Sequence, residues 1–135
     1  MFKKYVIFLC FMIFSGCSIL HSATDTIMGT YSKGLERQRD KAIVKTVDLG
    51  IDECFEKVLA TLDNIDADVL KVDFYNYTIF TVVYKHDYSG ADTKIFLTSE
   101  SDQKTKVEII ALSTSIKEFA ADRIFSELDK KPIKQ

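Results

Sequence analysis

The sequence predicts an α+β fold of two layers, in which two helices pack on one face of a mainly antiparallel sheet. Two stretches, one after Gly50 and one after Ser115, repeat apolar residues at the 3.6-residue spacing of a helix. Other stretches are short, β-prone and separated by polar turns, which favours antiparallel neighbours. Each helix has one apolar stripe, and one face of the sheet provides the surface that buries it. The predicted order is β-α-β-β-β-β-α, over residues 42–129.

The predicted domain begins with a strand and a helix. Residues 42–49 are β-branched and half-alternating, which is typical of a strand. Gly50 suits a helix N-cap, and Asp52 and Glu53 follow where acids interact favourably with the positive end of the helix dipole. The helix then carries a single apolar stripe. That stripe consists of Ile51, Cys54, Phe55, Val58, Leu59, Leu62 and Ile65.

Four strands and a second helix complete the predicted domain. The strands are expected at residues 69–74, 77–85, 93–99 and 105–112. Ser115 and Glu118 have the spacing of a capping box, which predicts the start of the last helix. Pro132 lies just beyond the expected end of that helix. Its apolar stripe consists of Ile116, Phe119, Ala120, Ile124 and Leu128.

The N-terminus has the layout of a secretory signal peptide. Lys3 and Lys4 precede an apolar run over residues 5–14, and small residues follow that run. The run is about half of the ~20 residues that a permanent membrane-spanning helix needs. We therefore expect residues 1–16 to direct export. An ordinary cleaved signal peptide and an uncleaved anchor both remain alternatives at this stage.

The end of that segment, Phe14-Ser15-Gly16-Cys17, resembles the lipobox of bacterial lipoproteins, with Phe14 where that family usually has Leu. The resemblance implies lipid transfer to Cys17, cleavage between Gly16 and Cys17, and acylation of the new amino terminus. Two or more acyl chains hold a protein stably on a membrane. Residues 17–41 would then be the lipidated cysteine and a tether, and residues 130–135 a C-terminal tail. In a diderm host, Ser18 resembles the signature of an outer-membrane lipoprotein facing the periplasm; in a monoderm host the domain would face outward from the cell membrane.

The net charge and the cysteine content indicate which partners and which covalent cross-links to expect. Loss of residues 1–16 would remove Lys3 and Lys4 and no acid, so the formal net charge would change from −2 to −4. An acidic balance argues against nucleic acid as a partner, because nucleic acid requires a basic surface. Cys10 would leave with the signal peptide and Cys17 would carry lipid. Cys54 would then have no cysteine partner, so we expect no internal disulfide.

No motif in the sequence points to catalysis, a metal or a cofactor. His21 lies in the predicted tether and His86 in a predicted loop, so no pair of histidines falls on one element. A metal site built on His or Cys needs several ligands at close spacing, and the sequence does not supply them. His86 and Asp87 are neighbours of Ser89, but adjacent residues point apart and do not form a triad. Cys54 falls on an apolar stripe, where a cysteine is usually buried and unreactive. We therefore expect the protein not to be an enzyme.

One predicted strand, residues 77–85, is apolar on both of its faces. If the helices cover one face of the sheet, the other face would carry an apolar patch, and such patches often mark contact surfaces. The alternative is that the tether, the C-terminal tail or the strand twist covers this face. The residues of the candidate contact face are Phe80, Val82, Tyr84, Phe96 and Ile110.

Several stretches of the chain resemble a group of small uncharacterised bacterial lipoproteins. These stretches are residues 36–42, 54–57, 92–98, 106–109, 111–113 and 124–128. The resemblance covers most of the mature chain and consists mainly of core and cap positions. It implies the same compact architecture and carries over no catalytic residue. This chain departs from the group at Lys94-Ile95-Phe96, which puts a shared site at that strand in doubt.

The leading hypothesis is a lipoprotein that is held on the membrane through Cys17 and binds another envelope protein without catalysing a reaction. The alternative is a carrier that holds a lipid or another small apolar ligand between the sheet and the helices. An enzyme with a site that no motif reveals is a third class, because function depends on sites rather than on folds.

Overall fold

The computed structural model describes residues 33–86 and 89–130. The predicted signal peptide, its cleavage site, Cys17 and most of the predicted tether lie outside the described residues, as do residues 131–135. The chain divides into two units, Met1–Gly34 and Leu35–Gln135. The fold described below is that of the second unit.

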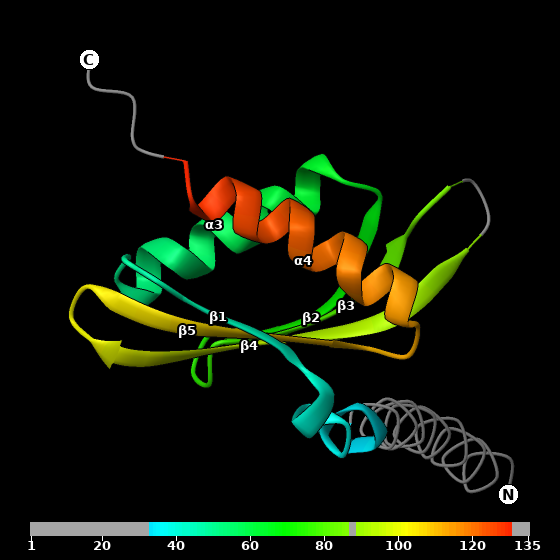
Figure 1. The fold of residues 1–135 in the computed structure, drawn as a ribbon, viewed down its shortest axis with the longest axis horizontal. Helices are drawn as coiled ribbons and strands as arrows, with labels where there is room; N and C mark the ends of the chain where they lie inside the picture. Colours follow the sequence, from blue (N-terminus) through cyan, green and yellow to red (C-terminus); the bar gives the residue numbers. More distant parts are fainter. Residues whose placement is uncertain (1–32, 87–88, 131–135) are drawn as a thin grey trace, which may run out of the picture. The chain divides into compact units, whose positions relative to one another are not determined.

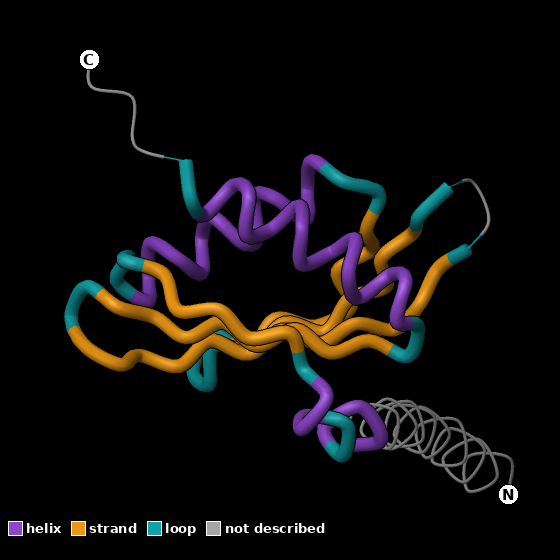
Figure 2. Tube along the Cα trace, viewed as in Figure 1, coloured by secondary structure: helices purple, strands orange, loops and turns teal. Residues whose placement is uncertain are grey.

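This unit contains a five-stranded antiparallel sheet with two main helices packed on it, which confirms the predicted α+β class. The strands lie side by side in the order β1-β5-β4-β3-β2, and each neighbouring pair is antiparallel. Both helices cover the same side of the sheet (Figures 1 and 2). The elements are η1 (Arg39–Lys41), β1 (Ile43–Val47), α3 (Ile51–Asn64), β2 (Ala67–Asp73), β3 (Thr78–Tyr84), β4 (Gly90–Ser101), β5 (Lys104–Ala111) and α4 (Thr114–Leu128).

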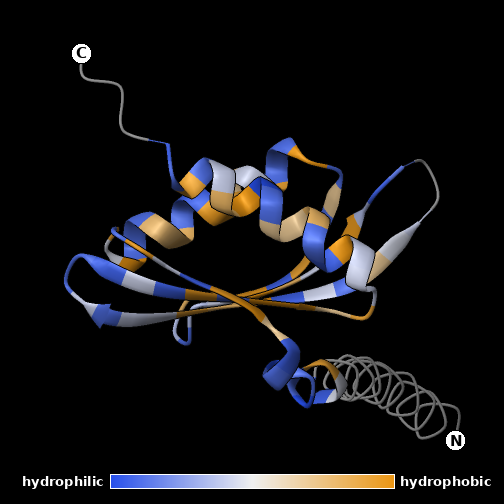
Figure 3. Cartoon of the chain, in the orientation of Figure 1, coloured by the Kyte–Doolittle hydropathy of each residue, from blue (hydrophilic) through white to orange (hydrophobic). Residues whose placement is uncertain are grey.

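The main core lies between the two helices and the sheet. Hydrophobic and hydrophilic residues are interspersed along both helices (Figure 3), and the apolar ones supply the helical side of this core. The predicted buried stripe of α3 is confirmed at Cys54, Phe55, Val58 and Leu62. The hydrophobic residues with no exposed area are Cys54, Val58, Leu62, Ile79, Val83, Ile95, Val107, Ile109, Ala120 and Ile124. The layer between sheet and helices is therefore filled by the protein's own side chains.

The start of α3 agrees with the prediction and the start of α4 does not. Gly50 is the N-cap of α3, and Asp52 and Glu53 lie in its first turn. The N-cap of α4 is Ser113 rather than the predicted Ser115. Ser113 has an extended backbone, and its hydroxyl oxygen accepts a hydrogen bond from the amide of Ile116 at 3.4 Å. The capping-box pattern at Ser115 is misleading because Ser115 already lies inside the first turn of the helix.

Strand β4 begins earlier than predicted, at Gly90 rather than at residue 93. Gly90 pairs with Tyr84 across the β3–β4 hairpin. A β-carbon at Gly90 would lie 2.6 Å from the Tyr84 ring, which is too close for any residue but glycine without a shift. The glycine therefore extends the strand here, because it lets the neighbouring ring approach the backbone closely.

Candidate functional site

The face of the sheet opposite the helices, here called the second face, holds a small apolar cluster of its own. Phe80 from β3, Phe96 from β4 and Ile110 from β5 form this cluster together with Leu35. Leu35 comes from residues 35–41, which precede β1 and are here called the strap. Figure 1 shows η1, the last part of the strap, on the side of the sheet away from α3 and α4. Leu35 is 1% exposed, so its side chain is as buried as the main core.

Two ion pairs hold the strap on the sheet beside Leu35. The Arg39 Nε donates to Oε2 of Glu108 at 2.6 Å, and the Arg39 guanidinium carbon lies 4.2 Å from the centre of the Phe96 ring. Glu36 forms an ion pair with Lys94, whose ammonium group is 5.2 Å from the centre of the same ring. The strap thus places one apolar, one acidic and one basic side chain on matching partners of the sheet.

The two charged residues that the sheet contributes are themselves buried. Lys94 is 5% exposed and Glu108 is 6% exposed. Hydrogen bonds from Arg39 hold the pKa of the Glu108 carboxyl below its ordinary value, against the effect of burial, and Lys106 at 3.0 Å adds to this. Charged side chains are rarely this buried unless they are paired, so the strap completes the environment that both residues need.

The five residues of the predicted contact face therefore fall into two groups. Phe80, Phe96 and Ile110 do face the second side of the sheet, but the strap buries them. Val82 and Tyr84 are half-buried, and the Tyr84 hydroxyl donates to Asp68 at 3.1 Å. The cover comes from the last residues of the predicted tether, so the compact unit begins at Leu35 rather than at residue 42.

A different apolar surface is exposed along β2, at the end of the strand order. Among the described strands, β2 has a hydrogen-bonded neighbour on one side only. A bulge between Val69 and Lys71 takes Leu70 out of the regular pairing. The residues named the β2 edge below are Val69 (42% exposed), Leu70 (43%), Phe74 (70%) and Tyr75 (91%). The sequence offers one signal for this surface, namely two adjacent aromatic residues in a polar turn.

The turn after β2 has a defined structure, in which Tyr75 is almost fully exposed. The ring of Phe74 is partly exposed and also contacts the buried Phe55 ring edge-on, with the ring centres 5.7 Å apart. The Asp73 carboxylate accepts from the amides of Tyr75 and Asn76, both at 3.0 Å. The Asn76 side chain also donates to it, and this bond is the main reason that the pKa of Asp73 is lowered. Tyr77 has a φ of 51°. Its hydroxyl donates to Asp52 at 2.7 Å, which fixes the end of the turn on α3.

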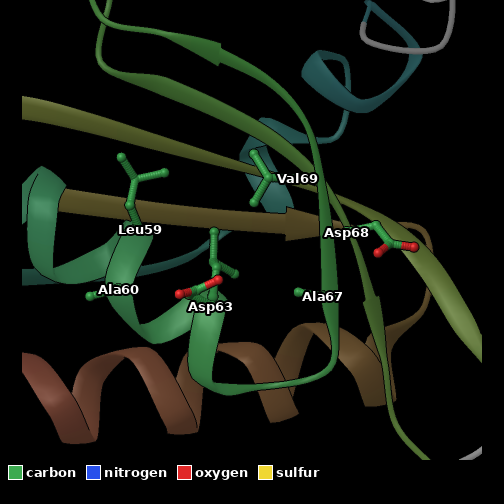
Figure 4. Close-up of a pocket in the computed structure, with 7 residues that line it drawn as sticks. Leu59, Ala60, Asp63, Ala67, Asp68 and Val69 are labelled. Carbon is green, nitrogen blue, oxygen red and sulfur yellow. The ribbon is translucent and has the colours of Figure 1, made fainter.

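A pocket of about 470 Å³ lies beside this edge, between the end of α3 and the start of β2. Figure 4 shows Leu59, Ala60 and Asp63 on the α3 side, whereas Asp68 points to the far side of β2. The pocket lining mixes apolar residues with acidic ones, and the pocket borders the main core at Leu62, which belongs to both. The lining residues are Leu59, Ala60, Leu62, Asp63, Ala67, Asp68 and Val69.

The residues singled out for chemistry do not come together in the described part of the chain. Burial raises the pKa of the Cys54 thiol to about 11. His86 is exposed and has a φ of 64°, and its neighbour Asp87 lies outside the described residues. Within residues 33–86 and 89–130, no group of three His, Cys, Asp or Glu side chains is placed to hold a metal ion. No helix in the same ranges has the length and apolar character that crossing a membrane requires.

Comparison with known proteins adds a distant structural neighbour and no family. No protein family matches the chain, and no curated protein matches it. The crystal structure of CalU16 from Micromonospora echinospora is similar over 67% of this chain and 76% of that chain, with 15% sequence identity and a TM-score of 0.43. A likeness this distant carries no argument about function.

Proposed function

We propose that this protein is a membrane-anchored bacterial lipoprotein whose folded unit binds another protein of the cell envelope and catalyses no reaction. Lipid on Cys17 would hold it on the outer membrane, facing the periplasm, in a diderm host. In a monoderm host it would lie on the outer face of the cell membrane. The lipobox-like sequence and the resemblance to small lipoproteins support the anchor.

The observation that carries the binding role is the exposed β2 edge. Edge strands present unpaired backbone groups, and proteins usually protect them with charges or a covering segment. This edge has a bulge and an exposed Lys71, as protected edges do. It also carries Val69, Leu70, Phe74 and Tyr75, all more than 40% exposed. Asp73 holds the turn in one conformation, so its aromatic side chains are presented without a large ordering cost. A partner that adds a strand or an apolar patch would fit this edge.

The test is capture of envelope proteins by the full lipidated chain after cross-linking. Wild type is compared with a Phe74→Asp/Tyr75→Asp double variant. The matched control is Leu112→Asp, because Leu112 is 56% exposed and is not part of the β2 edge. We expect a captured protein that the control retains and the double variant loses. The same captured set for all three proteins would contradict the binding role of this edge.

The anchor has a separate test, which is incorporation of labelled palmitate in cells. We expect label that remains on the wild-type protein and is absent from Cys17→Ala. Label on Cys17→Ala, or no stable label on wild type, would contradict lipidation at Cys17. Neither outcome depends on whether the β2 edge binds a partner.

The pocket beside β2 favours a second candidate, a carrier of a small apolar ligand. Because the layer between sheet and helices is filled, such a ligand would occupy this pocket instead. Native mass spectrometry after gentle extraction would then find a bound apolar molecule on wild type that Val69→Glu loses. An empty wild-type protein would count against the carrier.

A further inference from the structure

The β2 edge and the pocket beside it form one continuous surface. Val69 belongs to both, because it is 42% exposed on the strand and also lines the pocket. Leu59 and Asp63 line the same pocket from the last turns of α3 (Figure 4). A ligand that covers the edge therefore also reaches the pocket.

A segment that pairs with β2 would place only some of its side chains in this pocket. Side chains along a strand point alternately to the two faces of a sheet. Val69 lies on the helix side, since Ala67, two residues earlier on the same strand, packs against the main core. One side chain of the added segment would therefore lie beside Val69 in the pocket, and its neighbours would point toward the second face.

The charge around the pocket is negative. The stretch 58–70 contains three aspartates and no lysine or arginine, and no ion pair among the described residues involves any of the three. Asp63 lines the pocket from α3, whereas Asp68 points to the far side of β2 (Figure 4). The next base along the chain is Lys71. It pairs with Phe80 of the second face, so it lies on the side of the sheet away from the pocket.

Asp63 also runs against the preference of its own helix. It is the second-last residue of α3, and the last turn of that helix contains no base. The C-terminal end of a helix favours cations and disfavours acids, because the helix dipole is negative there. A residue that departs from such a local rule without a partner of its own is typical of a functional position.

We propose that the partner of the β2 edge is an extended, basic segment of an envelope protein, which adds as a strand beside β2 and places one lysine or arginine in the pocket. The aliphatic stem of that side chain packs on Leu59 and Val69, and its charged end reaches Asp63. Long basic side chains bury their stems on apolar surface in this way and keep the charge near water. This partner class rests on the binding role of the β2 edge in the proposed function.

The same arrangement distinguishes between partner segments. An apolar side chain at this position gains the stem contact and lacks the ion pair, and an acidic one is repelled by Asp63. Because Asp63 is exposed, its ion pair is partly screened by water. We therefore expect a preference of roughly two- to fivefold in affinity for a basic over an apolar side chain.

The test measures the binding of labelled peptides to the full chain in a non-ionic detergent by fluorescence anisotropy. Each peptide alternates threonine and valine around one central residue, which is lysine, norleucine or glutamate. Norleucine keeps the aliphatic stem of lysine without its charge. A further peptide has the lysine sequence with N-methylated backbone amides, which cannot add to an edge as a strand.

The protein variants change one charge at a time. Asp63→Asn removes the charge in the pocket, and Asp63→Lys reverses it with a residue that suits the end of a helix. The matched control is Asp122→Asn, which removes the same charge from an exposed position on α4. Circular dichroism checks that all of them remain folded.

We expect wild type and Asp122→Asn to bind the lysine peptide roughly two- to fivefold more tightly than the norleucine peptide, and the glutamate peptide most weakly. Asp63→Asn should remove the preference for lysine over norleucine, and Asp63→Lys should shift it to glutamate. Salt at about 1 M should also remove the preference of wild type, because it screens exposed charges.

Four results would overturn the proposal. They are the absence of binding by the lysine peptide, equal affinity of wild type for lysine and norleucine, a lysine preference that Asp63→Asn keeps, and undiminished binding of the N-methylated peptide. None of them decides the proposed function, because capture that the Phe74→Asp/Tyr75→Asp variant loses would still show a binding edge. The partner would then have a different chemistry.

Discussion

At the scale of single residues, the charges of the second face act mainly by positioning the strap. The Arg39 side chain is 45% exposed, so its pair with Glu108 is partly screened by water and contributes modestly to stability. Removing Arg39 has a larger effect, because it takes one of two counter-charges from the buried Glu108 carboxylate and leaves it with Lys106 alone. Leu35 supplies the apolar contact, and the two ion pairs beside it define where it binds.

The Glu108 carboxylate gives a pH-dependent prediction. Its pKa in the folded protein lies below the ordinary 4.5, because Arg39 and then Lys106 donate hydrogen bonds to it. A lowered folded pKa means that the ionised group stabilises the fold above pH 4.5 and that this contribution is lost as the pH falls through the folded pKa. The difference in unfolding free energy between wild type and Glu108→Gln should therefore shrink from about pH 7 to about pH 3. Urea unfolding followed by circular dichroism measures it, and a constant difference would contradict the assignment.

At the scale of elements, the helices and strands can be predicted because their apolar residues repeat with a regular period. The strap cannot be predicted in this way, because Leu35 is a single apolar residue beside the charged run 36–41. The residues that Leu35 contacts lie far along the chain. The alternation of side chains along the strands predicts that the candidate contact face lies on the second side of the sheet. The same alternation does not show that the strap covers this face. It also does not predict the β2 edge, because a bulge places Leu70 outside the regular pairing.

Two serines near the start of α4 are both candidates for the N-cap by sequence, and the structure shows that they have different roles. Ser113 caps the helix through its side chain, whereas Ser115 lies in the first turn and is exposed. Ser113→Ala should lower the unfolding free energy by about 1 kcal/mol, within the ~0.5–2 kcal/mol typical of lost N-caps. Ser115→Ala should change it by less than about 0.5 kcal/mol, as for other surface substitutions. Equal effects of the two substitutions in urea unfolding would show that Ser113 does not act as the cap.

At the scale of the whole molecule, one sheet supports two buried clusters on opposite faces. The main core includes both helices, and the smaller cluster includes the strap. Strands β3, β4 and β5 contribute side chains to both clusters, so loss of the sheet removes both. We therefore expect the unit from Leu35 onward to unfold as one cooperative transition, as small single domains usually do.

Cys54 reports on that transition. It has no exposed area, and burial raises its pKa to about 11, so it is both inaccessible and protonated in the folded protein. In the proposed mature lipoprotein Cys10 is removed and Cys17 is acylated, which leaves Cys54 as the single free thiol. Because Cys54 packs in the core shared by α3, α4 and the sheet, we expect a thiol reagent to reach it only through global unfolding.

The labelling rate should then rise with urea as steeply as the global unfolding equilibrium does, because both slopes measure the surface that unfolding exposes. The control is Ala60→Cys in a Cys54→Ala background, where an exposed position on the same helix should react at once in native buffer. Rapid labelling of Cys54 in native buffer, with little dependence on urea, would mean that α3 opens locally while the sheet stays folded. In that case the two clusters would not unfold together.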